Sequence, residues 1–270
     1  MAKKRSNEFS ENNLVVQSND LIQNANWRLN TMSLKLYKMV ISCIDTENPP
    51  KDNKIRLSKN EIIKFLEAEN VLQGTKTDQR YSTVRKALKN IRDKSVDLDM
   101  GKGVLTVGLM DSVYWEKDTD IVTCRIGPEM MPFLIDLNRN FLQYPVLNVQ
   151  CFSSKYGIIL YELLMSEWKK TQFKHFTFEV DDLRYSTNTV NKYSKWVNFE
   201  ARVLKPAVDD INQAEVEFFV KYRKRKGGGK SIRFIDFTIY IKERCNETWQ
   251  ELIERGGGDN YHNMTIDEFL

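Results

Sequence analysis

The feature that most constrains the fold is a weak internal repeat, offset by about 120 residues. The segment LKLYKMV (34–40) matches IILYELL (158–164), and both place apolar residues at helical spacing around a shared tyrosine. The segment IRLSKNEI (55–62) matches FTFEVDDL (176–183), and each reads as a short alternating strand that runs into a helix start. A fold that suits this chain must therefore supply the same unit twice.

A basic amphipathic helix and a hairpin follow in each half. The helices are predicted at residues 77–93 and 191–212, and each carries an apolar stripe with a period of three to four residues. Strands at 96–100 and 216–220 come next and match each other. The first hairpin is expected at 105–107, 113–115 and 121–126, and the second at 216–222 and 232–241. This order predicts an α+β fold of two tandem winged helix-turn-helix domains related by a pseudo-repeat.

The same patterns divide the chain into four parts. We expect a basic, disordered N-terminal segment at residues 1–13, a first winged-helix domain at 14–145 and a second at 146–243. An acidic C-terminal tail occupies residues 244–270, which contain two basic and six acidic residues.

Charge is distributed unevenly, although the net charge is only +4. Residues 221–233 contain seven basic residues and no acidic one. Duplex DNA carries about one negative charge per 1.7 Å of its axis, so this block suits phosphate contact. A solvated charged loop is the alternative interpretation, and such a loop usually includes acidic residues as well.

In the second predicted helix the polar residues off the apolar stripe fall close to one face. They are Lys192, Lys195, Asn198, Arg202 and Lys205. Long cationic side chains suit guanine and phosphate, and an amide suits adenine, so we expect residues 192–205 to lie in the major groove. Pro206 lacks a backbone N–H and should kink the helix there. A solvated helix face remains the alternative.

Two further groups of basic residues are candidate DNA contacts. In the first half the helix carries Arg80, Arg85, Lys86 and Lys89. Three roles are open for them: phosphate contact, base reading as a second recognition helix, or simple solvation. In the second hairpin, the wing is expected to follow the DNA backbone or enter the minor groove through Arg223, Lys224, Arg225, Lys226 and Lys230.

Motifs for catalysis or cofactor binding are absent from the sequence. Residues 227–231 resemble the end of a phosphate-binding loop, but Lys224 stands where that motif needs glycine and a strand follows. The two histidines, His175 and His262, are isolated, so we expect no catalytic residue, metal site or cofactor. The four cysteines form no CxxC pair, and no apolar run is long enough to span a bilayer. These features predict a cytoplasmic protein with reduced thiols and no membrane partner.

Four stretches together resemble the RepB-like initiator Rep family. They are SSKYGIILYELL at 153–164, residues 178–183, FEARVLKPAVDDIN at 199–212, and the basic glycine turn before IRF at 232–234. The opening NDLI at 19–22 and the Leu-Tyr pair at 36–37 also fit the first domain of that family. The resemblance covers about residues 12–243.

The resemblance implies a non-catalytic protein that binds repeated short sites (iterons), mainly through its second domain, at a plasmid origin. It also implies theta-type replication by the host replication initiator and replicative helicase, inside a bacterial host. Monomers would bind iterons, while dimers formed largely through the first domain would repress their own promoter and so help control copy number. Residues 264–270 are either a docking peptide or disordered. A dedicated transcriptional repressor on the same fold is the alternative function, and a nicking enzyme is a third class.

Overall fold

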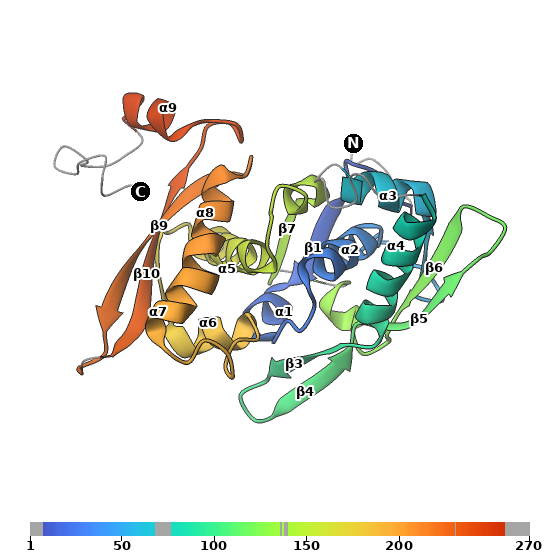
Figure 1. Ribbon diagram of the computed structural model, residues 1–270, viewed down its shortest axis with the longest axis horizontal. Coiled ribbons are helices and arrows are strands. Elements are labelled where there is room, and N and C mark those ends of the chain that lie inside the picture. Colours follow the sequence, from blue (N-terminus) through green and yellow to red (C-terminus); the bar gives the residue numbers. More distant parts are fainter. Residues whose placement is uncertain (1–7, 68–76, 136, 138–139, 230, 257–270) are drawn as a thin grey trace.

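The computed structural model describes residues 8–67, 77–135, 137, 140–229 and 231–256, and two α+β units lie side by side along its long axis (Figure 1). The first unit contains β1 (Leu14–Ser18), α1 (Asn19–Asn24), α2 (Thr31–Ser42), β2 (Lys54–Ser58), α3 (Lys59–Glu67), α4 (Thr77–Arg92), β3 (Ser95–Asp99), β4 (Val104–Gly108), β5 (Met110–Trp115), β6 (Ile121–Ile126), η1 (Met131–Phe133) and β7 (Phe141–Pro145). The second contains η2 (Val146–Val149), α5 (Lys155–Thr171), β8 (His175–Glu179), α6 (Val180–Ser186), α7 (Trp196–Phe199), η3 (Glu200–Leu204), α8 (Lys205–Gln213), β9 (Phe218–Lys226), β10 (Ile232–Ile241) and α9 (Trp249–Glu254).

The sheets confirm two winged helices and correct one part of the predicted repeat. The first unit has the antiparallel order β2-β6-β5 and the second the order β8-β10-β9, so β5 is the counterpart of β9. Residues 96–100, which we matched to 216–220, belong instead to β3 and its following turn, and β3 pairs with β4 in a separate hairpin. The match is wrong because the first unit contains this extra hairpin between its basic helix and its wing.

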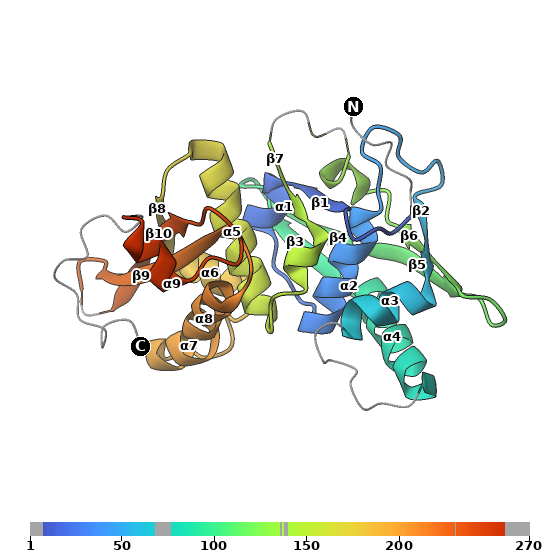
Figure 2. The ribbon, with the colours of Figure 1, turned by 90° about the horizontal axis from the view of Figure 1, so that it is seen from above.

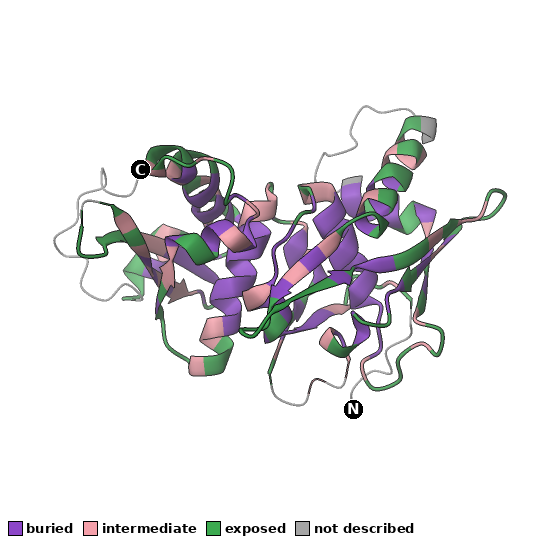
Figure 3. Cartoon of the chain, turned by 90° about the horizontal axis from the view of Figure 1, so that it is seen from below, coloured by how far each residue is buried: buried purple, intermediate pink, exposed green. Residues whose placement is uncertain are grey.

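Local sequence explains where the long central helices begin. The side chain of Asn30 accepts a hydrogen bond from the Ser33 amide at the start of α2, and the Ser154 side chain accepts one from the Gly157 amide at the start of α5. Both helices are buried over most of their length, as Figure 3 shows. Their apolar character on several faces suits a central position between other elements.

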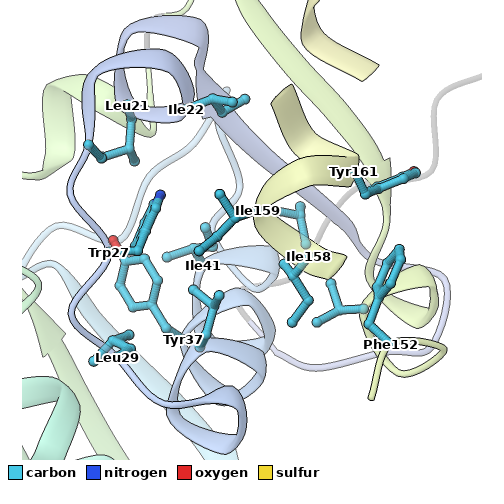
Figure 4. Close-up of a cluster of buried hydrophobic side chains, with 14 of the residues drawn as sticks. Leu21, Ile22, Trp27, Leu29, Tyr37, Ile41, Phe152, Ile158, Ile159 and Tyr161 are labelled. Carbon is cyan, nitrogen blue, oxygen red and sulfur yellow. The ribbon is translucent and has the colours of Figure 1, made fainter. Parts of the chain in front are cut away.

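The two units share one core. Trp27 and Tyr37 from the α1–α2 region lie against Ile158 and Ile159 of α5 (Figure 4), and the Trp27 and Tyr37 ring centroids are 6.0 Å apart. Within this joint the Lys38 ammonium lies 2.8 Å from the Glu162 carboxylate, and both side chains are at most 2% exposed.

Both ends of the described chain pack against the body. Phe9 makes an edge-to-face contact with Phe65, so the disorder expected through residue 13 does not extend over residues 8–13. In the tail, α9 begins with a capping box between Thr248 and Glu251. Trp249 stacks on Phe219 of β9 with centroids 4.3 Å apart. The expected docking segment, 264–270, lies outside the described residues. Within the described part, no helix combines the length and apolarity needed to cross a bilayer.

Candidate nucleic-acid interface

The helix of the second unit that carries the predicted DNA contacts begins at Trp196, five residues later than expected. Lys192 lies in the preceding loop, and Lys195 is the residue that caps the helix with extended backbone angles. The Arg184 guanidinium explains this late start, because it donates hydrogen bonds to the carbonyls of Lys192 and Tyr193 at 3.2 and 2.9 Å. Tyr193 also has a positive φ of 54°, which is incompatible with a right-handed helix. The predicted rod over residues 192–205 is therefore wrong in its first turn.

The expected kink at Pro206 takes the form of a widened turn. Residues Glu200–Leu204 form a π-helical turn between α7 and α8, and this turn ends two residues before Pro206. Proline has no N–H to donate to the carbonyl four residues earlier, and its ring crowds that carbonyl. A wider turn relieves this crowding, and such turns are frequent at functional sites. Helices α7 and α8, with this turn between them, therefore form one continuous helix with a local change of twist. We name it the recognition helix, after the DNA-binding role that the sequence predicts for it.

The recognition helix has a buried face and an exposed polar face. Phe199, Val203 and Ala207 are at most 2% exposed, which confirms the predicted apolar stripe. Asn198 and Arg202 lie off this stripe and are exposed, and within the described chain neither side chain has a hydrogen bond or ion pair. Both are thus available to an external partner. Lys205 is also exposed but has an intramolecular interaction.

A glutamate that the sequence analysis did not single out ties the wing to the recognition helix. Glu200 accepts hydrogen bonds from the Trp196 indole at 2.9 Å and the Tyr222 hydroxyl at 3.0 Å, and the Lys224 ammonium lies 2.9 Å away. Burial opposes ionisation, but these donors and the positive charge hold the pKa of Glu200 below its ordinary value. Lys224 therefore has a partner within the protein, so it fits the predicted DNA contact less well than an unpaired lysine would. The sequence alone does not indicate that Glu200 and Lys224, which lie 24 positions apart in the chain, form an ion pair.

The remaining wing residues divide by their partners. The Arg225 guanidinium lies 3.0 Å from the Asp236 carboxylate on the neighbouring strand and stacks over the Phe234 ring at 4.5 Å. Arg223 and Lys226 are exposed, and no ion pair with another described residue engages either one. Lys230 lies outside the described residues. Of the five predicted wing contacts, Arg223 and Lys226 are the two that the described structure leaves available.

The first unit presents a second basic helix. In α4, Val84, Leu88 and Ile91 are fully buried, as the apolar stripe predicts. The exposed side bears Arg85, Lys86 and Lys89. Arg80 is half-buried and already interacts within the protein, so it fits the predicted contact less well.

The two basic helices face the same side of the molecule. In Figure 2 both α4 and the α7–α8 segment lie along the lower edge, and Figure 3, from the opposite direction, agrees. The wing β9–β10 and the hairpin β5–β6 lie at opposite ends of the long axis. This arrangement allows one extended polyanion to contact both units at once.

Two family models match the chain. The model described as Initiator Replication protein, WH1, matches residues 14–165, and the one described as Initiator Rep protein, WH2, matches residues 179–239. The chain belongs to the initiator replication protein family. The chain is also 21% identical over 209 residues to a replication initiation protein from Escherichia coli. The match covers 76% of this chain and 61% of the relative, so the chain spans about three-fifths of the relative's length.

A solved structure shares the fold of this initiator family member. The crystal structure of Pi initiator protein in complex with iteron DNA aligns with a TM-score of 0.68 at 16% sequence identity. The alignment covers 87% of this chain and 99% of that one. Among the described residues of the chain, no group of three or more His, Cys, Asp and Glu side chains is placed to hold a metal ion.

Proposed function

We propose that this protein starts plasmid replication by binding repeated duplex sites at the origin. It acts by binding alone: it helps to open the origin and recruits the host replication initiator and replicative helicase in the cytoplasm of a bacterial host. The observation that carries this proposal is the pair of basic helices on one side, with Asn198 and Arg202 exposed and available on the recognition helix. Family membership and the iteron complex of the structurally similar Pi initiator support it.

Footprinting on the DNA upstream of the coding region tests this function. We expect protection of tandem direct repeats spaced by about two helical turns, because each repeat would then meet the protein on the same side of the duplex. Protection of a single inverted repeat would favour the alternative function, a dedicated repressor. Incubation with supercoiled origin DNA and Mg²⁺ should leave the circles supercoiled, and relaxed circles would instead indicate a nicking enzyme.

The wing contributes affinity through phosphate contacts. Replacing Arg223 and Lys226 together with alanine should lower the salt dependence of binding by about two units of slope, one for each lost phosphate contact. The matched control is Arg225→Ala, because that guanidinium is paired with Asp236 and should change the slope less. Affinity is measured over a series of salt concentrations. An unchanged slope in the double variant would show that Arg223 and Lys226 do not contact the DNA phosphates.

Self-association is assigned to the first unit, through the free edge of β4. The other strand of this hairpin, β3, has its outer side bridged by Ala25, which leaves β4 as the open edge among the described strands. Val104 is 63% and Leu105 39% exposed there, and an exposed apolar edge strand favours pairing with a second copy. In our proposal dimers of this kind repress the protein's own promoter, whereas monomers bind the origin repeats.

Replacing Val104 with lysine should weaken this dimer at least about tenfold, because a charge would be buried at the new strand pair. Ile253→Lys in the second unit is the matched control, since Ile253 is 40% exposed on α9, which lies at the other end of the molecule from β4 (Figure 1). Sedimentation equilibrium over a range of concentrations measures the dissociation constant. Equal dimer dissociation constants in the two variants would exclude the β4 edge as the dimer interface.

A further inference from the structure

An apolar strip runs along the centre of the recognition helix, on the side directed away from the core. Val197 is 71% exposed, more than any other large apolar side chain of the described residues, and Ala201 one turn later is also exposed. Each lies two residues from the fully buried Phe199, which is about 200° around an α-helix. The two apolar residues therefore point directly outward, between the polar residues Asn198 and Arg202 on one flank and Glu200 on the other.

The chemistry of this strip matches one group in the major groove. The N-terminal residues of a recognition helix are those that contact base edges, and Val197 lies in the first turn. The thymine 5-methyl is the apolar group on the major-groove edges of the base pairs, whereas the other groups there are hydrogen-bond donors and acceptors. An outward valine with neighbouring alanine offers no hydrogen bond, so it discriminates by apolar contact.

Glu200 does not compete for this position. A glutamate in a recognition helix can accept a hydrogen bond from cytosine N4. Here one carboxylate oxygen accepts from Tyr222 and lies beside Lys224, and the other accepts from Trp196. Because both oxygens are engaged inside the protein, the flank next to Val197 does not favour cytosine.

We propose that Val197, supported by Ala201, is a specificity-determining residue that packs on the 5-methyl group of a thymine in the bound site. This inference rests on the proposed function, in which the recognition helix enters the major groove. The thymine lies next to the base pair that Asn198 or Arg202 contacts, because these side chains neighbour Val197 on the same outward surface.

Uracil substitution tests this contact with the full-length chain. A preferred duplex is first selected from a random pool, and each thymine is then replaced singly by deoxyuridine, which removes the methyl and leaves the hydrogen-bonding edges unchanged. At one position, affinity for the wild-type protein should fall about fourfold, the value of one buried methyl group. Val197→Ala should bind the thymine site about fourfold more weakly and no longer distinguish thymine from uracil there.

Two controls distinguish loss of the methyl contact from unfolding of the variant protein. Alanine has a higher helix propensity than valine, so Val197→Ala should keep the melting temperature of the wild type. Ile253→Ala alters another exposed apolar residue, on α9, and should keep the full preference for thymine. A uracil scan with no loss above twofold, or an unchanged penalty in Val197→Ala, overturns the methyl contact while leaving the initiator function in place. A pool that yields no preferred sequence overturns both.

Discussion

Replacing Glu162 with leucine is expected to lower the free energy of unfolding by about 3–5 kcal/mol, because it leaves a buried ammonium without its counter-charge. The Lys38 ammonium lies 2.8 Å from this carboxylate at the joint between the two units. Burial lowers the pKa of Lys38, and Glu162 opposes that shift. Gln17 and Tyr144 also donate hydrogen bonds to Glu162, so they lose their acceptor as well.

Urea denaturation of matched variants measures this effect. Lys38→Met should destabilise by a similar amount, and the double variant Lys38→Met/Glu162→Leu should recover much of the loss, because both charges are then gone. Lys64→Ala is the control, since Lys64 and Glu11 form a pair on the surface with side chains 80% and 60% exposed. That change should cost less than about 1 kcal/mol. Strict additivity in the double variant would contradict a coupled buried pair.

Replacing Arg202 with alanine should weaken binding to the selected site about 10- to 100-fold, which corresponds to roughly 1–3 kcal/mol for a lost base contact. Binding to random duplex should fall only a few-fold, because base contacts carry the sequence information and phosphate contacts do not. Both affinities are measured at one fixed salt concentration.

Lys192→Ala is the matched control for this experiment. Lys192 is a cation exposed in the loop before the recognition helix, where we expect phosphate contact instead of base reading. Its loss should therefore weaken binding to the selected and the random duplex by the same factor. If Arg202→Ala shows this same uniform loss, base reading by Arg202 is excluded.

Periodicity predicted the helices and their buried faces. The stripes at Val84, Leu88 and Ile91 and at Phe199 and Val203 are buried as expected, because helical geometry relates residues three and four apart whatever surrounds them. Strand partners could not be predicted in this way. The alternation at 96–100 marks a strand, but its partner depends on which chain segment folds against it.

Sequence patterns also could not predict which basic residues have partners within the protein and which are available to DNA. Lys224 and Arg225 read as DNA contacts from charge alone, yet Glu200 and Asp236 bind them. The recognition helix starts late because Arg184, on the preceding helix, holds the loop carbonyls of Lys192 and Tyr193. Each of these partners lies eight or more residues away in the chain.

The sequence by itself determined two winged-helix units, their family and the helices that carry the positive charge, since these follow from short-range periodicity and local composition. The tertiary structure alone decided which cations stay available, that Val197 faces outward between Asn198 and Glu200, and that Lys38 meets Glu162 in a common core. The reason is physical: ion pairs and burial depend on distances between segments remote in the chain, which no local pattern encodes.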